Sequence, residues 1–250
     1  MRYFYIGLHQ PSDAGHFNRA CVSINRLRNR RKRIDCPILL DSGAFTELFQ
    51  YHGYRHEPSE YAREVRRLVN NKVADIEIAV SQDYMCEPVM LNKTSLTVRD
   101  HQRLTIKRYG ALLKEHLPVP VMPVLQGYHP QEYVDHIDMY GDHLAFDMHV
   151  GVGSVCKRNG DPRAIIEVLE AITKAAPWLR LHGFGIKKTS LQNQDIRQLL
   201  YSADSMAWSY AGRKKNGKLA NDWRYAKSFL DDIENLINKD MESAKCLDSP

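Results

Sequence analysis

The sequence lacks any apolar run long enough to span a bilayer, and it lacks any pair of cysteines in a CxxC spacing. A membrane-spanning helix needs about 20 apolar residues, and a zinc ribbon needs closely spaced cysteine ligands. The cysteines are odd in number and scattered, at Cys21, Cys36, Cys86, Cys156 and Cys246. These absences argue against a membrane protein, a zinc ribbon and a disulfide framework. With an N-terminus too short and polar-flanked for a signal peptide, they favour a reduced, cytoplasmic protein.

Internal repeats, linkers and low-complexity segments are also missing. The chain has 250 residues, of which 43% are hydrophobic and 26% charged, and these are values of globular proteins. A chain of this length suits one domain with a full core. We therefore expect a single domain over residues 1–240, followed by a frayed tail at 241–250.

Basic residues are present in mild excess, with a net charge of +5, and they are clustered. Six of the eight residues from Arg26 to Arg33 are basic, and a second cluster begins at Arg213. Basic runs are often solvated loops, but each cluster lies just beyond a predicted strand, which favours contacts to phosphates. The predicted backbone-binding residues are Arg26, Arg28, Arg30, Arg31, Lys32, Arg33, Lys187, Arg213 and Lys214.

Short apolar runs alternate with segments of helical periodicity along the whole chain, and this alternation is typical of a parallel sheet. Helices are predicted from Pro58, at 96–116 and 131–140, from Pro162, and at 190–201 and 221–237. Eight strands are predicted, at 3–8, 20–24, 38–41, 76–80, 119–125, 146–153, 181–186 and 205–209. Eight strands in one domain predict a (β/α)8 TIM-type barrel, with a doubly wound open sheet as the alternative.

Polar side chains and glycines stand where these strands end. Asp41-Ser42-Gly43-Ala44-Phe45 follows the apolar run 37–40, and glycine there lets the backbone approach a ligand. Asp41 could instead cap the segment that follows it. The other strand ends carry Asp83, Gln126, residues 151–154, Gly185 with Lys187, and Asp204 with Trp208. In a barrel, chemistry takes place at the C-terminal ends of the strands, so these groups are expected to converge.

Carboxylates without a histidine–cysteine cluster favour chemistry at a sugar or a phosphate. One possibility is metal-assisted phosphoryl chemistry, and the other is cleavage at a sugar carbon that a carboxylate stabilises or attacks. The individual residues also have structural interpretations. Asp204 could bond to a loop, Asp83 could pair with Arg99 or Arg103, and Trp208 could belong to the core. Asp147 is a further candidate carboxylate, whereas lone histidines such as His9, His149 and His182 are usually structural.

The order of these motifs resembles the tRNA-guanine transglycosylase superfamily. The resemblance is carried by Asp41 to Phe45, by Asp83, by Leu125-Gln126-Gly127, and by Gly183-Phe184-Gly185. Residues 151–156 and 204–210 are more similar to the DNA-directed, DpdA-like branch, which puts 7-deazaguanines into DNA and includes glycosylases that remove modified bases from phage DNA. The similarity extends over about residues 1–230.

The resemblance implies a (β/α)8 barrel that breaks an N-glycosidic bond without a metal or another cofactor. Asp41 then matches a catalytic aspartate that acts as general acid/base, and Asp204 is the second candidate. An ungapped match places Ala207, not Asp204, at the position of the family's nucleophilic aspartate. The zinc site of the tRNA enzymes has no counterpart, which disfavours tRNA. The expected base-binding residues are Ser42, Gly43, Asp83, Gln126, Gly127, Gly151, Gly153, Ser154, Gly185 and Trp208.

The sequence therefore predicts an enzyme that acts on double-stranded DNA with a flipped base, and not on a membrane. Two outcomes remain open: exchange of guanine for a free 7-deazaguanine, or hydrolysis of a modified base to an abasic site in phage defence. The alternatives are a metal-dependent phosphoesterase, a related enzyme acting on RNA, and a non-catalytic nucleic-acid-binding module.

Overall fold

All strands of the protein run parallel in one sheet. The computed structural model describes residues 1–158, 160–215 and 217–247. The order of the strands is β5-β4-β3-β2-β1-β9-β8-β7-β6. Their bounds are β1 Tyr3–Gly7, β2 Ala20–Ser23, β3 Pro37–Asp41, β4 Asp75–Val80, β5 Val121–Met122, β6 Val124–Leu125, β7 His149–Val152, β8 Arg180–Gly183 and β9 Ser202–Ser205.

The two edge strands, β5 and β6, are two halves of one strand interrupted at Pro123. On one side, the amide of Ser81 donates to the carbonyl of Met122 at 3.0 Å. On the other side, the amide of Gly151 donates to the carbonyl of Pro123 at 2.9 Å. The segment thus joins β4 to β7, while β1 pairs with β9. The sheet is therefore a nearly closed barrel with eight strand positions, and the predicted TIM-type fold is confirmed.

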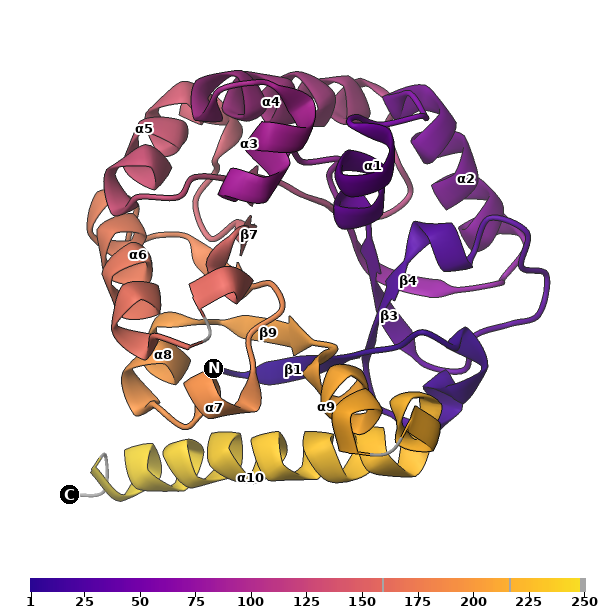
Figure 1. Cartoon of the computed structure of the whole chain (residues 1–250), viewed down its shortest axis with the longest axis vertical. Helices are drawn as coiled ribbons and strands as arrows, with labels where there is room; N and C mark the ends of the chain where they lie inside the picture. Colours follow the sequence, from indigo (N-terminus) through magenta and orange to yellow (C-terminus); the bar gives the residue numbers. More distant parts are fainter. Residues whose placement is uncertain (159, 216, 248–250) are drawn as a thin grey trace.

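Helices surround this barrel as a ring (Figure 1). Residues 8–19 and 24–36, all described, contain only the 3-10 turns η1 (Pro11–His16) and η2 (Ile24–Arg26), so β1 and β2 are not followed by α-helices. The α-helices are α1 Ala44–Tyr51, α2 Pro58–Asn70, α3 Pro88–Thr94, α4 Val98–Lys114, α5 Pro130–Tyr140, α6 Pro162–Ala175, α7 Lys188–Leu191, α8 Gln194–Leu199, α9 Ala207–Lys215 and α10 Trp223–Leu247. The long α10 lies beside β1 and occupies the place that a helix after β1 would take (Figure 1).

The core has two layers, as the alternation of side chains along each strand requires. A large apolar cluster fills the space between sheet and helices and includes Ile6, Leu40 and Leu169. A smaller cluster inside the barrel includes Leu39 and Met122. None of the helices in the described part of the chain combines the length and the apolar character needed to span a bilayer.

The structure corrects the predicted last strand. It was expected at 205–209, but β9 covers Ser202–Ser205 and helix α9 begins at Ala207. Trp208 is therefore a helical residue, buried in the core, and its indole Nε1 donates to the carbonyl of Gly7 at 2.8 Å. The run Ala-Trp-Ser-Tyr has apolar and aromatic residues that suit a strand as well as a helix, so the sequence alone did not separate the two.

The strands predicted at 146–153 and 181–186 are shorter in the structure, at His149–Val152 and Arg180–Gly183, and two predicted helices also differ. The helix expected at 190–201 is split into α7 and α8, because Asn193 caps α8 by accepting from the amide of Asp195 at 2.8 Å. The helix expected to end at 237 continues to Leu247. The expected tail is thus helical from 241 to 247, and residues 248–250 lie outside the described part.

Helix α10 is fastened to α8 by a buried arginine. The guanidinium of Arg197 binds both carboxylate oxygens of Asp240, at 2.6 and 2.7 Å. The same guanidinium donates to the carbonyls of Leu191 and Gln192 at the end of α7. Removing it would leave a carboxylate and two carbonyls without their donor.

We predict that Arg197→Ala lowers the free energy of unfolding by about 2–4 kcal/mol, because it breaks a mostly buried ion pair. The matched control is Arg224→Ala, which removes an exposed guanidinium 3.9 Å from Asp222 and should cost less than about 0.5 kcal/mol. Urea unfolding of both variants measures the difference. Equal losses would show that the Arg197 bonds do not fasten the helix.

Candidate active site

A cavity of about 420 Å³ opens at the C-terminal ends of the strands. Each of the eight strand positions contributes at least one residue to its wall or to the loop just beyond. Three of the contributed side chains are carboxylates that are far apart in the sequence, namely Asp41, Asp83 and Asp204. Their convergence is the expected consequence of a closed parallel barrel.

Asp41 is the last residue of β3 and its position is fixed by the turn into α1. Its Oδ2 accepts a hydrogen bond from the amide of Gly43 at 3.0 Å. Gly43 has a φ of 79°, and a Cβ there would lie 2.5 Å from Nδ2 of Asn25. A side chain at this position is therefore disfavoured both by the backbone conformation and by the clash with Asn25. Burial, and then the negative charge of Asp204, raise the pKa of Asp41 to about 6.

Asp83 lies deeper and is held by three polar neighbours. Its Oδ1 accepts from the hydroxyl of Ser42 at 3.3 Å, and its Oδ2 accepts from Nε2 of Gln126. The hydroxyl of Tyr54 donates to the Asp83 carbonyl at 3.1 Å. Burial, and then the charge of Asp41, raise the pKa of Asp83 to about 7. The carboxyl groups of Asp41 and Asp83 therefore both titrate close to neutral pH.

Gln126 reaches Asp83 only because Gly153 has no side chain. A Cβ on Gly153 would lie 2.1 Å from Nε2 of Gln126. The other end of the amide is fixed as well, because Oε1 accepts from the hydroxyl of Ser154 at 2.9 Å and from the amide of Cys86 at 3.3 Å. Ser154 itself has a φ of 62°, which is uncommon for a residue other than glycine. This part of the cavity wall is therefore a preorganised set of polar groups.

Asp204 lies on the opposite wall, near the end of β9. Its Oδ1 accepts from the amide of Gly185 at 3.1 Å and lies 3.3 Å from Nε2 of His182. Cys21 of β2 lines the same cavity, and burial, then the charges of Asp204 and Asp41, raise the pKa of its thiol. The structure therefore brings Asp41 and Asp204 to one cavity, on strands separated by β2 and β1.

Several predicted base-binding residues are not on the wall of the cavity. Ser42 is buried behind Asp83, and Gly127 packs against Tyr133. Gly151 lies under the ring of Phe184, where a Cβ would be 2.3 Å from a ring carbon. Trp208 is in the core, as described above. These residues shape the site from behind. The predicted base-binding residues that line the cavity directly are Gly43, Asp83, Gln126, Gly153, Ser154 and Gly185.

The two basic clusters meet at one side of the cavity mouth. Arg26 and His9 both line the cavity. Burial, then the positive charges of Arg26 and Arg213, lower the pKa of His9, which places the two arginines near the same imidazole. Arg30 bonds instead to Ser12 and to the carbonyl of Arg33, and Lys214 lies over the ring of Tyr210. Arg31, Lys32 and Arg33 are exposed.

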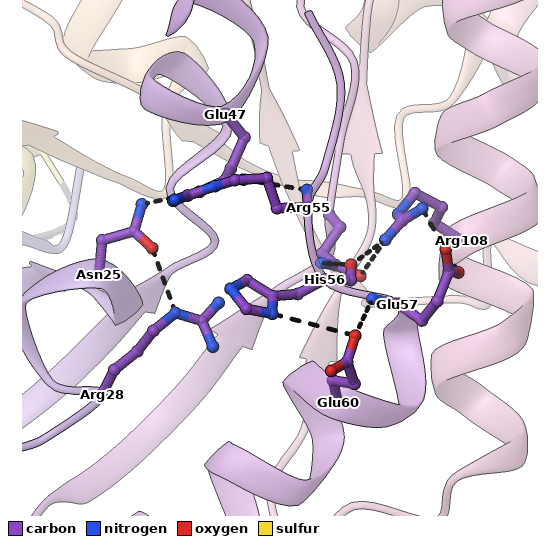
Figure 2. A network of polar contacts seen from close by, with 9 residues as sticks. Asn25, Arg28, Glu47, Arg55, His56, Glu57, Glu60 and Arg108 are labelled. Atoms are coloured by element: carbon purple, nitrogen blue, oxygen red, sulfur yellow. Dashed lines mark hydrogen bonds and ion pairs between the residues drawn. The ribbon is translucent and has the colours of Figure 1, made fainter. Parts of the chain in front are cut away.

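Arg28 belongs to a polar network beside the cavity, drawn in Figure 2. Its Nε donates to Oδ1 of Asn25 at 3.4 Å, and Nδ2 of Asn25 donates to the buried Glu47 at 3.4 Å. Burial alone would raise the pKa of Glu47, but hydrogen bonds and the charge of Arg55 lower it overall. The network ties the basic loop to α1 and thereby to Gly43, next to Asp41.

Sequence reasoning missed the apolar and sulfur-containing part of the wall, which includes Phe45, Phe184 and Met206. Phe45 is 49% exposed and stacks on Phe49 at 5.5 Å. Phe45 and Phe184 both belong to the motifs that carried the resemblance, so their place in those motifs was the available clue. Asp147, the further candidate carboxylate, precedes β7 and binds Arg180. It therefore belongs to the opposite end of the barrel.

Within the described ranges, no three His, Cys, Asp or Glu side chains are grouped so as to hold a metal ion. A family model described as DpdA, DeoxyPurine in DNA protein A, matches residues 1–229. The chain belongs to the DpdA family. This family is the DNA-directed branch related to the tRNA-guanine transglycosylases, and it points to a transglycosylase that acts on DNA. A comparison with curated proteins gave no match.

The raised pKa of Asp83 has a consequence for stability. The unfolded chain ionises this carboxyl near pH 4, whereas the folded chain holds its proton up to about pH 7. The folded state therefore binds more protons between these values, and stability falls as the pH rises through this window. Below pH 4 both states hold the proton, so this carboxyl no longer makes the stability depend on pH.

We predict that Asp83→Asn loses less stability than the parent protein between pH 5 and pH 8, by on the order of 1–3 kcal/mol. Asparagine is neutral at both values and keeps an acceptor for Gln126. Urea unfolding of the two proteins at each pH measures the difference. Parallel losses of stability in the two proteins would contradict a raised pKa at this position.

Proposed function

We propose that this protein cleaves the N-glycosidic bond of a purine-type nucleotide in DNA and exchanges the base for a free 7-deazaguanine. The observation that supports this most is the placement of Asp41 and Asp204 on one cavity, part of whose wall is a fixed set of hydrogen-bonding groups around Gln126. Membership of the DpdA family supports DNA as the substrate. A cavity of about 420 Å³ is of the size that accommodates one small ligand such as a nucleobase.

The two catalytic carboxylates differ in environment, and this difference suggests their roles. The amide of Gly185 donates to Oδ1 of Asp204, and Nε2 of His182 lies 3.3 Å from the same oxygen, as suits a carboxylate that acts in its ionised form. Asp41 has its pKa raised to about 6 and can hold and release a proton near neutral pH. We therefore assign Asp204 as the nucleophile at the anomeric carbon, and Asp41 as the acid that protonates the leaving base.

The opposite wall suits the edge of a guanine-like base. Such an edge presents an oxygen acceptor beside two N–H donors. The carboxylate of Asp83 can accept from the donors, and the amide of Gln126 can face the acceptor with its remaining N–H. Gly153 leaves room for the base to approach the backbone. A base bound in this way would lower the pKa of Asp83, because its donors favour the carboxylate.

DNA would lie across the basic side of the mouth. A base inside a duplex cannot reach a cavity within a barrel, so the nucleotide must leave the stack at a cost of a few kcal/mol. We assign Arg26 and Arg213, whose charges both act on His9, as the residues that hold the phosphates next to the flipped nucleotide.

After the base has left, the sugar carbon is bonded to Asp204, and either a second base or water can displace the aspartate. Exchange incorporates the new base, whereas hydrolysis leaves an abasic site. Incubation of DNA with labelled 7-deazaguanine, followed by alkali, separates these outcomes. Label retained in intact DNA indicates exchange, and strand breaks at alkaline pH indicate hydrolysis. Hydrolysis alone would contradict the exchange step, and the absence of both products would overturn the proposal.

We predict that Asp204→Asn and Asp41→Asn each lower the rate of base release by about 1,000-fold, because each variant removes a group that takes part in the transition state. The matched control is Asp138→Asn on the exposed face of α5, which should retain the parent rate. Release of radiolabelled guanine from duplex DNA measures all three. Full activity of either active-site variant would contradict its assigned role.

We predict that Arg26→Ala and Arg213→Ala weaken DNA binding. Each variant should make the negative slope of log affinity against log salt shallower by about one unit. The control is Arg163→Ala, an exposed position on α6. Fluorescence anisotropy with labelled duplex between low and high salt gives the slopes. An unchanged slope for both variants would place the DNA elsewhere on the protein.

A further inference from the structure

A chain of polar side chains on β7, β8 and β9 runs through the interior of the barrel and ends at Asp204. Nε2 of His182 lies 3.3 Å from Oδ1 of Asp204, and Nδ1 of His182 lies 2.8 Å from the hydroxyl of Ser202. The same hydroxyl lies 2.8 Å from Nε2 of His149. His182 and Ser202 are fully buried. Neighbouring interior positions carry apolar side chains such as Leu39 and Met122.

The number of hydrogen atoms on these polar side chains restricts how their hydrogen bonds can be arranged. The hydroxyl of Ser202 has one hydrogen and meets two imidazole nitrogens. If Asp204 is ionised and His182 is neutral, Nε2 of His182 must carry the hydrogen, because a bare nitrogen would face a carboxylate. Nδ1 of His182 then accepts from Ser202, and Ser202 accepts from Nε2–H of His149. Every other arrangement leaves two lone pairs facing each other, or requires a proton on Asp204 or a second proton on His182.

We propose that Ser202 and His149 hold His182 as its Nε2–H tautomer, so that His182 donates to Oδ1 of Asp204 and orients this carboxylate toward the sugar. His182, Ser202 and His149 are thus positioning residues that act through Asp204, and none of them contacts the substrate. The inference rests on the proposed function for its role in catalysis, but the tautomer itself does not depend on that function.

Two further observations fit this arrangement. The amide of Gly185 donates to the same oxygen, so both bonds fall on Oδ1, and Oδ2 stays outside them. Burial, then the charges of His182 and Arg180, lower the pKa of His149 to about 3. His149 is therefore neutral at neutral pH, and it has a single N–H to donate to Ser202. Steric packing alone would be served equally well by apolar side chains, without the cost of burying polar groups.

The tautomer can be measured directly on the full-length protein. Long-range ¹H–¹⁵N correlation spectra of ¹⁵N-histidine protein at pH 7.5 distinguish Nε2–H from Nδ1–H imidazoles, and the spectrum of His182→Gln identifies the His182 signals. We expect the Nε2–H form in the parent protein and a mixture of both forms in Ser202→Ala. An Nδ1–H form in the parent, or an unchanged spectrum in Ser202→Ala, would overturn the proposal.

Kinetics then test the effect on Asp204. We expect Ser202→Ala to lower kcat for base release by roughly 10-fold with little change in KM, because the carboxylate loses its orientation but the base pocket is intact. The matched control is Ser209→Ala, which removes a buried hydroxyl bonded to the carbonyl of Ala220 in α9 and η5 (Gly217–Asn221). It should keep the parent kcat. Equal effects of the two serine variants would indicate a merely structural hydroxyl.

A conservative replacement gives a second kinetic test. Glutamine at position 182 can still present an N–H near the place of Nε2, whereas phenylalanine cannot, so kcat of His182→Gln should exceed that of His182→Phe by about 10-fold. Equal rates would overturn the positioning role. If the parent protein releases no base at all, the proposed function fails, while the tautomer measurement still decides the hydrogen-bond arrangement.

Discussion

Closure of the parallel sheet is the constraint on which the site depends. β1 pairs with β9, with Tyr5 opposite Asp204, and β2 pairs with β3, with Ser23 opposite Asp41. These pairings place aspartates that are more than 160 positions apart in the sequence on one rim. The closure tolerates one irregularity at Pro123, which has no amide hydrogen to donate but offers its carbonyl to β7. Without the pairing of β1 with β9, Asp204 would lie on an edge strand, away from Asp41.

Burial of the carboxyl groups in the cavity is unfavourable in free energy, and the chemistry of the site follows from that penalty. Burying several carboxylates beside one another disfavours their charged forms, and the raised pKa values of Asp41 and Asp83 express this. Hydrogen bonds from Gln126, Ser42 and Gly43 offset part of the penalty. The result is a cavity in which acids and bases coexist near neutral pH, as glycosidic-bond cleavage requires.

The sequence predicted the barrel because strand and helix periods alternate clearly, and it predicted the rim residues because parallel strands all end at one side. The predicted last strand was wrong, because the pattern of residues 205–209 does not separate a strand from a helix. In the structure, β9 ends at Ser205 and α9 begins at Ala207. The sequence could not distinguish residues on the wall, such as Gly153, from those behind it, such as Gly127, because both flank polar motifs.

The histidines show a second limit of sequence reasoning. His149 and His182 looked like ordinary structural residues, because nothing in their local sequence points to Asp204. Only the register of β7, β8 and β9 brings them together through Ser202. The influence of Arg26 and Arg213 on the pKa of His9 is of the same kind, since it depends on segments that are distant in the sequence coming near one another.

The absence of helices in the described residues after β1 and β2 has a consequence for how the molecule is made. The outer face of β1 is covered by α10, and one of its edges is paired by β9, so β1 meets these two elements only when the last quarter of the chain exists. Contacts between the two ends of a chain are slow to form, because a long loop must close first. During synthesis, the N-terminal strands therefore emerge before β9 and α10, which pair with and cover β1. The cavity lined by Asp41 and Asp204 is then completed last.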